Sequence, residues 1–128
     1  MLRYLAAAAL LAAAASAQTL DCREPVDQHT MNKCAWRDFD VADKNLNTVY
    51  RRVMQATGDE STRTKLRLAQ RAWIQFRDSQ CTFENVDNEG GSIYPMVFTG
   101  CKTRLTKART KELADYLACL KNADNCGG

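Results

Sequence analysis

Apolar residues recur along most of this chain at intervals of three and four positions, the spacing of one face of an α-helix. The first apolar stripe contains Ala35, Phe39, Ala42, Leu46, Val49, Val53 and Ala56. Thr30 is a favourable N-cap before this stripe, and Gly58 is a favourable stop after it. The pattern predicts a long first helix that buries one face.

A second helix is predicted to open near Asp59 or Ser61 and to end near Cys81 or Phe83. The residues expected on its inner face are Leu66, Ala69, Trp73, Phe76 and Phe83. From Glu84 to Ser92 the apolar period gives way to asparagine, aspartate and glycine, which are typical of a connecting loop.

A third helix is expected to begin between Ser92 and Pro95, because proline suits a first turn in which its missing amide would be unpaired anyway. Its apolar residues continue to Leu120, with Gly100 as a weak point near the start. Residues 93–99 are the one apolar run that competes as a strand. The predicted fold class is all-α, a helical hairpin plus a third helix forming a small bundle stapled by disulfides.

The first 17 residues have the pattern of a cleavable export signal. Arg3 gives a positive start, residues 5–15 are apolar, and residues 15–17 are small, as a signal peptidase requires. The apolar run is shorter than the roughly 20 residues of a membrane-spanning helix. The mature protein is therefore expected to begin near Gln18 and to form a single domain over residues 18–128.

The mature chain contains six cysteines: Cys22, Cys34, Cys81, Cys101, Cys119 and Cys126. In an exported protein of this size they indicate three disulfides, formed in the periplasm or outside the cell. The sequence does not choose among the many pairings; the economical expectation is Cys22–Cys34, Cys81–Cys101 and Cys119–Cys126. A metal site is not expected, because the chain has no Cys-x-x-Cys pair and a single histidine. Asp21 stands where a lipidation motif requires a small residue, so Cys22 is expected to be a disulfide partner.

The segment from Gln70 to Cys81 combines a tryptophan, an adjacent Arg77-Asp78 pair and a cysteine at helical spacing. Further residues stand around it in order: Ala42-Asp43, Leu46-Asn47 and Tyr50 upstream, then Gly90-Gly91-Ser92, Cys101, Leu105-Thr106, Arg109 and Leu113 downstream. In this order they resemble the LprI-type lysozyme inhibitor family of small secreted or envelope-associated helical proteins, over roughly Cys22 to Leu120. The resemblance implies a protein that binds another protein, with lysozyme as the first candidate partner and no cofactor.

Most signature residues are interpreted as structural, namely Asp43, Asn47, Tyr50, Gln70, Trp73, Arg77 and Asp78. Those on the second helix share one stripe, except that Asp78 is turned about 100 degrees from Arg77. Trp73 is expected to fill the core, and Arg77 or Asp78 to form an ion pair with another helix. Asp43 and Asn47 are the expected partners, because an antiparallel second helix passes the first at mid-length.

Charge is nearly balanced overall but unevenly distributed. Acidic residues gather in the loop and on the first helix, whereas five cations crowd the third helix: Lys102, Arg104, Lys107, Arg109 and Lys111. A solvated helix face is the ordinary interpretation of such a run. The alternative function is a cell-envelope module whose basic helix binds anionic cell-wall or lipid groups. Nucleic acid is not an expected partner of an exported, nearly neutral chain.

The acidic loop bears on the lysozyme hypothesis, because animal-type lysozymes are strongly basic and cleave glycan with two carboxyl groups in a cleft. Glu84, Asp87 and Glu89 are expected to steer the protein to such an enzyme. Ser92 or Tyr94, beside the Gly-Gly pair, is expected to donate a hydrogen bond to a catalytic carboxylate. The predicted function is a secreted or periplasmic inhibitor that occludes the glycan cleft.

An enzyme is not expected, because the sequence has no Gly-x-Ser-x-Gly elbow, His-Glu-x-x-His motif or phosphate-binding glycine loop. His29 stands near the start of the first helix, where a surface or capping role is ordinary. A small hydrolase built around His29 is the alternative from another class.

Overall fold

The computed structural model describes residues 19–122 and residue 126, so the export signal expected over residues 1–17 lies outside the described residues. The described chain forms α1 (Gln28–Ala56), α2 (Glu60–Glu84), the short 3-10 helix η1 (Val86–Asn88) and α3 (Tyr94–Asn122). These residues contain no strand. The all-α prediction and the prediction of three long helices are confirmed.

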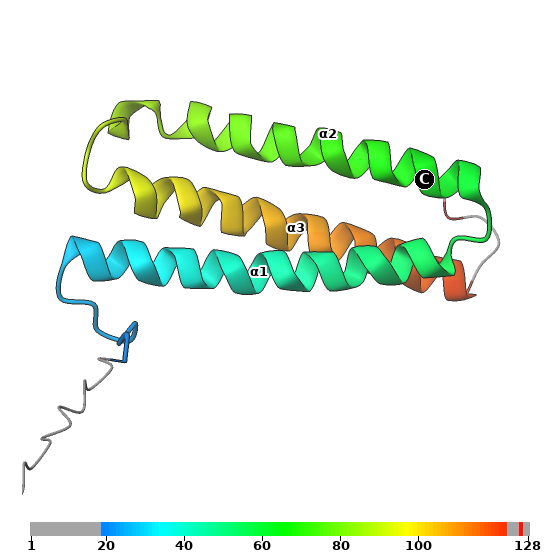
Figure 1. The fold of residues 1–128 in the computed structure, drawn as a ribbon, viewed down its shortest axis with the longest axis horizontal. Coiled ribbons are helices and arrows are strands. Elements are labelled where there is room, and N and C mark those ends of the chain that lie inside the picture. Colours follow the sequence, from blue (N-terminus) through cyan, green and yellow to red (C-terminus); the bar gives the residue numbers. More distant parts are fainter. Residues whose placement is uncertain (1–18, 123–125, 127–128) are drawn as a thin grey trace, which may run out of the picture.

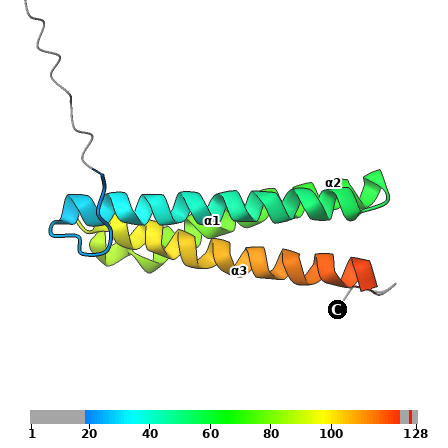
Figure 2. The ribbon, with the colours of Figure 1, turned by 90° about the horizontal axis from the view of Figure 1, so that it is seen from below.

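The three helices form an elongated bundle with up-down-up topology (Figure 1). The parallel helices α1 and α3 share the most extensive contact, and α2 runs antiparallel to both (Figures 1 and 2). The α2–α3 connection and the start of α1 lie at one end, which we call the loop end (residues 19–33 and 83–94). The α1–α2 turn and the end of α3 lie at the other, the turn end (residues 50–67 and 113–122).

Aspartate side chains cap the first two helices. The Asp27 carboxylate accepts a hydrogen bond from the Thr30 amide at 2.7 Å, and Asp59 caps α2 in the same way. These bonds favour the charged form, so the pKa of each aspartate is lowered. The expectation that Thr30 caps α1 is therefore wrong, because the carboxylate three residues earlier reaches its amide. At the other end of α1, Thr57 is the C-cap and Gly58 follows it.

The apolar core lies between α1 and α3 and consists of Leu46, Val53, Leu113 and Leu117. Half-buried side chains of all three helices pack against it, among them Tyr50, Leu66 and Trp73. The predicted stripe of α1 supplies Ala42, Leu46 and Val53 as buried residues, whereas Ala56 is exposed. The core is small and occupies the half of the bundle nearer the turn end.

The predicted inner face of α2 is wrong at Ala69, Phe76 and Phe83. All three residues are exposed, Phe76 by 55% and Phe83 by 73%. The buried residues of α2 are Gln70, Arg77 and Cys81. Because α2 carries apolar side chains on two sides, apolar periodicity alone does not decide which side faces inward.

The three predicted disulfides are present as Cys22–Cys34, Cys81–Cys101 and Cys119–Cys126. The first ties the N-terminal lead to α1, and the second joins the last turns of α2 to α3 across the connecting loop. These two bridges brace the loop end, which lies away from the apolar core.

Arg77 is the polar centre of the bundle, with only 7% of its side chain exposed. Its Nε donates to Asp78 of the same helix at 2.9 Å, and one terminal nitrogen lies 3.6 Å from Asp43 of α1. The same nitrogen donates to the Thr106 hydroxyl of α3 at 3.5 Å. The expected ion pair with Asp43 is thus present, and Asn47 supports it by donating to that carboxylate at 3.3 Å.

Buried cations alternate with aromatic rings along the bundle. The Lys102 ammonium lies 4.3 Å from the ring centre of Phe39, and the Arg77 guanidinium lies 5.2 Å from the same centre. The Trp73 ring lies between Arg77 and Arg109, at 5.4 and 5.9 Å. Each ring therefore attracts two cations. This cation–aromatic ladder joins all three helices.

Replacing Arg77 by alanine should lower the free energy of unfolding by about 3–5 kcal/mol, because it removes the buried partner of two carboxylates and leaves the ladder rings unpacked. Urea denaturation followed by circular dichroism measures the change. Arg104→Ala is the matched control, since it breaks an exposed ion pair with Glu84 and should cost at most about 1 kcal/mol. Equal, small losses for both variants would contradict this account of Arg77.

Burial lowers the pKa of Lys102, although Asp78, 3.8 Å from its ammonium, opposes the shift. The folded state therefore disfavours the charged amine relative to the unfolded chain. This cost is fully present below the folded pKa and is relieved as the pH rises from there toward the ordinary value of 10.5.

Lys102→Met should accordingly leave stability near neutral pH unchanged or raise it by up to about 2 kcal/mol. The variant should also lose the part of the alkaline rise in stability that comes from Lys102. Denaturant titrations from neutral to alkaline pH measure both effects. A loss of more than about 2 kcal/mol at neutral pH would show that the charged amine stabilises the bundle.

Candidate functional site

The five predicted contact residues all lie at the loop end. Glu84 is the last residue of α2, Asp87 lies in η1, Glu89 and Ser92 lie in the connection, and Tyr94 opens α3. All except Tyr94, which is half-buried, are exposed. The fold therefore brings the acidic residues and the two hydroxyl groups to one end of the bundle.

The three acids of this loop differ in their surroundings. Glu84 accepts hydrogen bonds from Gln80 at 2.9 Å and from Arg104 at 2.6 Å, and these bonds lower its pKa. Asp87 and Glu89 form no ion pair with any of the described residues. Glu84 thus fastens α2 to α3, whereas the charges of Asp87 and Glu89 are directed to solvent.

The Gly-Gly pair gives the connection its shape. Gly90 has a φ of 75°, in the left-handed region that other residues rarely adopt. The next turn places the carbonyl of Ser92 3.2 Å from the side-chain amide of Asn32 on α1, which donates to it. The Tyr94 ring stacks on Phe98, with 5.4 Å between ring centres. Of the two predicted hydroxyl donors, Ser92 is therefore the more accessible.

The connection is also anchored where α2 ends. Asn85 is buried, and its side chain donates to the carbonyl of Cys81 at 2.8 Å. Cys81 is itself bonded to Cys101 of α3. With the bond from Asn32 to Ser92, the connection is fixed to all three helices. A braced loop loses little conformational freedom on binding, which favours affinity.

Charge is separated along the bundle. Six acids and two cations lie at the loop end: Asp21, Glu24, Asp27, Glu84, Asp87 and Glu89 against Arg23 and Lys33. The balance is reversed at the turn end, with Arg51, Arg52, Arg63, Lys65, Arg67 and Lys121 against Asp59, Glu60 and Asp115. The near-neutral total thus conceals an acidic end and a basic end.

The loop end also exposes apolar side chains that sequence analysis missed. Val26 is 91% exposed, Val86 55% and Ile93 39%. An isolated apolar residue in a loop gives no periodic pattern, so the sequence does not show whether a neighbour covers it. We define the loop-end surface as these three side chains together with the exposed acids near them in sequence, Glu24, Asp87 and Glu89.

The cations of α3 do not form a free basic face. Lys102 belongs to the cation–aromatic ladder, and Arg104, Arg109 and Lys111 form ion pairs with acids of the bundle. Lys107 is the one member of this group without such a partner among the described residues. The observation behind the envelope-binding alternative, a continuous basic third helix, is therefore weakened.

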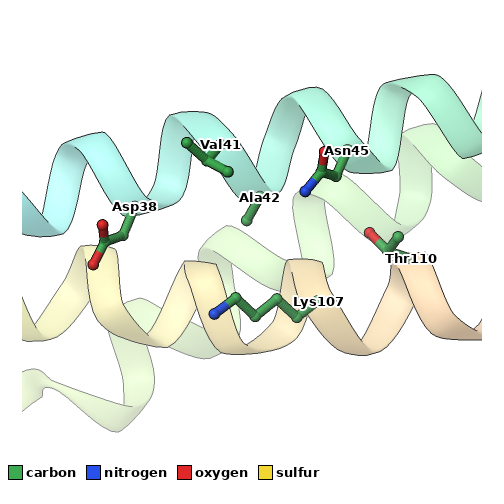
Figure 3. A pocket seen from close by; sticks show the side chains of 6 residues that line it. All are labelled: Asp38, Val41, Ala42, Asn45, Lys107 and Thr110. Carbon is green, nitrogen blue, oxygen red and sulfur yellow. The ribbon is translucent and has the colours of Figure 1, made fainter.

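A shallow groove of about 380 Å³ lies between α1 and α3 (Figure 3). It is lined by Asp38, Val41, Ala42, Asn45, Lys107 and Thr110. The Asp38 carboxylate and the Lys107 ammonium both project into it, from different helices (Figure 3). Its lining contains one carboxylate and one ammonium group and no histidine.

Other candidate chemistry finds little support in the described part of the chain. His29 is exposed on the first turn of α1. No group of three histidine, cysteine or acidic side chains is placed to hold a metal ion there. None of the described helices is both long and apolar enough to cross a membrane.

Residues 22–113 match the family described as lysozyme inhibitor LprI, and this span includes all of α1 and α2, the connection between α2 and α3, and most of α3. The chain is also 40% identical over 114 residues to an uncharacterized protein of Rhizobium meliloti (strain 1021), covering 80% of this chain and 82% of that protein. No solved structure matches the chain. With Asp43, Trp73 and Asp78 of its signature in contact with Arg77, the protein belongs to the LprI lysozyme inhibitor family.

Proposed function

We propose that this protein inhibits a basic, animal-type lysozyme by placing the loop-end surface across the glycan cleft of the enzyme. The main support is the loop-end surface, in which exposed apolar side chains and unpaired acids lie on the braced α2–α3 connection and on the N-terminal lead that Cys22–Cys34 ties to α1. Membership of an inhibitor family supplies the class of target.

Electrostatic attraction accounts for the first stage of binding. Because the loop end carries a net negative charge and the turn end a net positive one, the field of a basic enzyme orients the inhibitor with its loop end forward. Asp87 and Glu89 are the acids best placed for this role, since Glu84 is already paired with Arg104. The association rate should therefore fall as salt screens these charges.

Cleft occlusion accounts for the second stage. Val26, Val86 and Ile93 supply apolar area for the centre of an interface, and the acids form its polar rim. The exposed Ser92 hydroxyl is the proposed donor to one of the catalytic carboxyl groups. The inhibitor performs no chemistry in this mechanism, because it acts by excluding glycan from the cleft.

The proposed site of action is the periplasm or the cell exterior. Three disulfides persist in oxidising compartments and are rare in the cytosol. The export signal expected from the sequence leads to the same compartments, where a lysozyme meets the cell wall.

Reversing Asp87 and Glu89 to lysine should weaken inhibition by at least about tenfold and reduce its dependence on salt, because attraction to the enzyme becomes repulsion. The assay follows the clearing of a peptidoglycan suspension by an animal-type lysozyme while the exported, oxidised protein is titrated in. The reduced protein serves as a control for the folded, disulfide-bonded state.

Asp40→Lys with Asp115→Lys is the matched charge control. Both carboxylates are exposed, each forms one ion pair with a lysine four residues away, and both lie outside the loop-end surface. This variant should inhibit within about twofold of the unchanged protein. Equal losses in the two variants would show that total charge, rather than the loop end, is responsible. Absence of inhibition by the unchanged oxidised protein would refute the proposed target.

A further inference from the structure

A second groove lies between α1 and α2, which approach each other less closely than either approaches α3. We call it the α1–α2 groove, and its volume is about 260 Å³. The contributions of α2 recur at helical spacing, so they lie on one side of that helix. Three signature residues and three others line the groove: Asn47, Tyr50, Gln70, Arg67, Arg71 and Ile74.

Gln70 brings a buried amide to this groove, since only 7% of the residue is exposed. Its side-chain oxygen accepts a hydrogen bond from Nε of Arg109 on α3 at 3.2 Å. A guanidinium group can only donate, so this bond fixes the amide with its oxygen toward Arg109 and leaves its NH2 group for the groove. No described residue accepts a hydrogen bond from that NH2 group. A buried donor without a partner is costly, and an acceptor that enters the groove removes the cost.

Other donors around the groove are also without partners. The Arg71 side chain is exposed and forms no ion pair with any described residue. The Tyr50 hydroxyl forms no hydrogen bond within the described part of the chain. Arg67, in contrast, is neutralised by Glu60 at 2.7 Å. The lining therefore offers a surplus of donors and one uncompensated positive charge.

We propose that the α1–α2 groove binds the carboxylate of a small organic acid with an apolar body. The Arg71 guanidinium pairs with the carboxylate, and the Gln70 amide and the Tyr50 hydroxyl donate to its remaining lone pairs. Ile74, which is 40% exposed, and the Tyr50 ring contact the apolar body.

Charge and polarity select a carboxylate over a phosphate. A phosphate monoester carries a charge of about −1.5 to −2 at neutral pH, whereas the lining has one free cation. A carboxylate carries a single charge and accepts a guanidinium through two parallel hydrogen bonds. The apolar part of the lining is left without a partner by an inorganic anion and is covered by an organic acid.

The α1–α2 groove shares no residue with the loop-end surface. Binding of an acid is therefore measured without lysozyme, and its failure leaves the proposed inhibition untouched. Two sources supply the same chemistry, namely a free aliphatic acid and the C-terminal carboxylate of a peptide. Isocaproate represents the first source and N-acetyl-leucine the second, and the neutral amide of each serves as its control.

Titration of the exported, oxidised, isotope-labelled protein, followed by nuclear magnetic resonance, tests the inference. At least one acid should bind with a dissociation constant of about 1 mM or lower and shift the side-chain NH2 signals of Gln70. The corresponding amide should bind at least about tenfold more weakly, and the tighter of the two acids identifies the source. Failure of both acids, equal binding of the amides, or tighter binding of inorganic phosphate would each overturn the proposal.

Two variants test the donors. Arg71→Gln should weaken binding of the acid by at least about tenfold, and the exposed, unpaired position should leave the fold unchanged in circular dichroism. Gln70→Glu keeps an acceptor for Arg109 but replaces the NH2 group by a carboxylate oxygen, so it should also weaken binding by at least about tenfold. Unchanged affinity in Arg71→Gln overturns the proposal whether or not the second variant folds.

Arg52→Gln is the matched control, because it removes the same charge from an exposed arginine that forms no ion pair with a described residue. Arg52 lies roughly 200 degrees around α1 from Tyr50, so it faces away from the groove. Its replacement should change the dissociation constant by less than about twofold. Equal losses in Arg52→Gln and Arg71→Gln would show non-specific attraction and overturn the inference.

Discussion

A buried guanidinium fixes how the three helices meet. Burying a cation is unfavourable unless acids and hydrogen-bond acceptors surround it, and the groups around Arg77 come from different helices. Asp43 reaches it from α1, Asp78 from α2 itself and Thr106 from α3. Only one rotation of α2 about its axis satisfies this arrangement. That rotation turns Phe76 outward and sets the direction in which the α2–α3 connection leaves the bundle.

The contacts of Arg77 also explain which parts of this structure the sequence predicts and which it does not. The helix bounds are local features, and the sequence predicts them from apolar spacing and turn residues. The disulfides join consecutive cysteines, which is the economical pairing among the many that the sequence leaves open. Which side of α2 faces inward is not determined locally, because it depends on partners that α1 and α3 supply to Arg77. Apolar periodicity therefore places Phe76 and Phe83 on the wrong side. The ion pair with Asp43 is predictable because an antiparallel hairpin aligns the middles of its helices.

The candidate site also combines local features that the sequence predicts with long-range features that it does not. The acids of the connecting loop are adjacent in sequence, so their gathering is predictable from the chain alone. The addition of Glu24 and Val26 is not, because it requires the lead to be tied back by Cys22–Cys34 and α1 to lie parallel to α3. The net charge of the chain likewise does not reveal how the charges are distributed over the bundle. A chain that is almost neutral in total has one acidic end and one basic end, and oppositely charged partners are attracted to each.

We propose that the loop end of the bundle, rather than its side, contacts lysozyme. The most direct test of this contact is nuclear magnetic resonance of the isotope-labelled, oxidised protein during titration with an inactive animal-type lysozyme. Contact through the loop end predicts that amide shifts or broadening concentrate in residues 21–30 and 85–93, while the turn end and the exposed side of α2 stay unchanged. Perturbations centred on the exposed side of α2 or on the groove between α1 and α3 would contradict this contact.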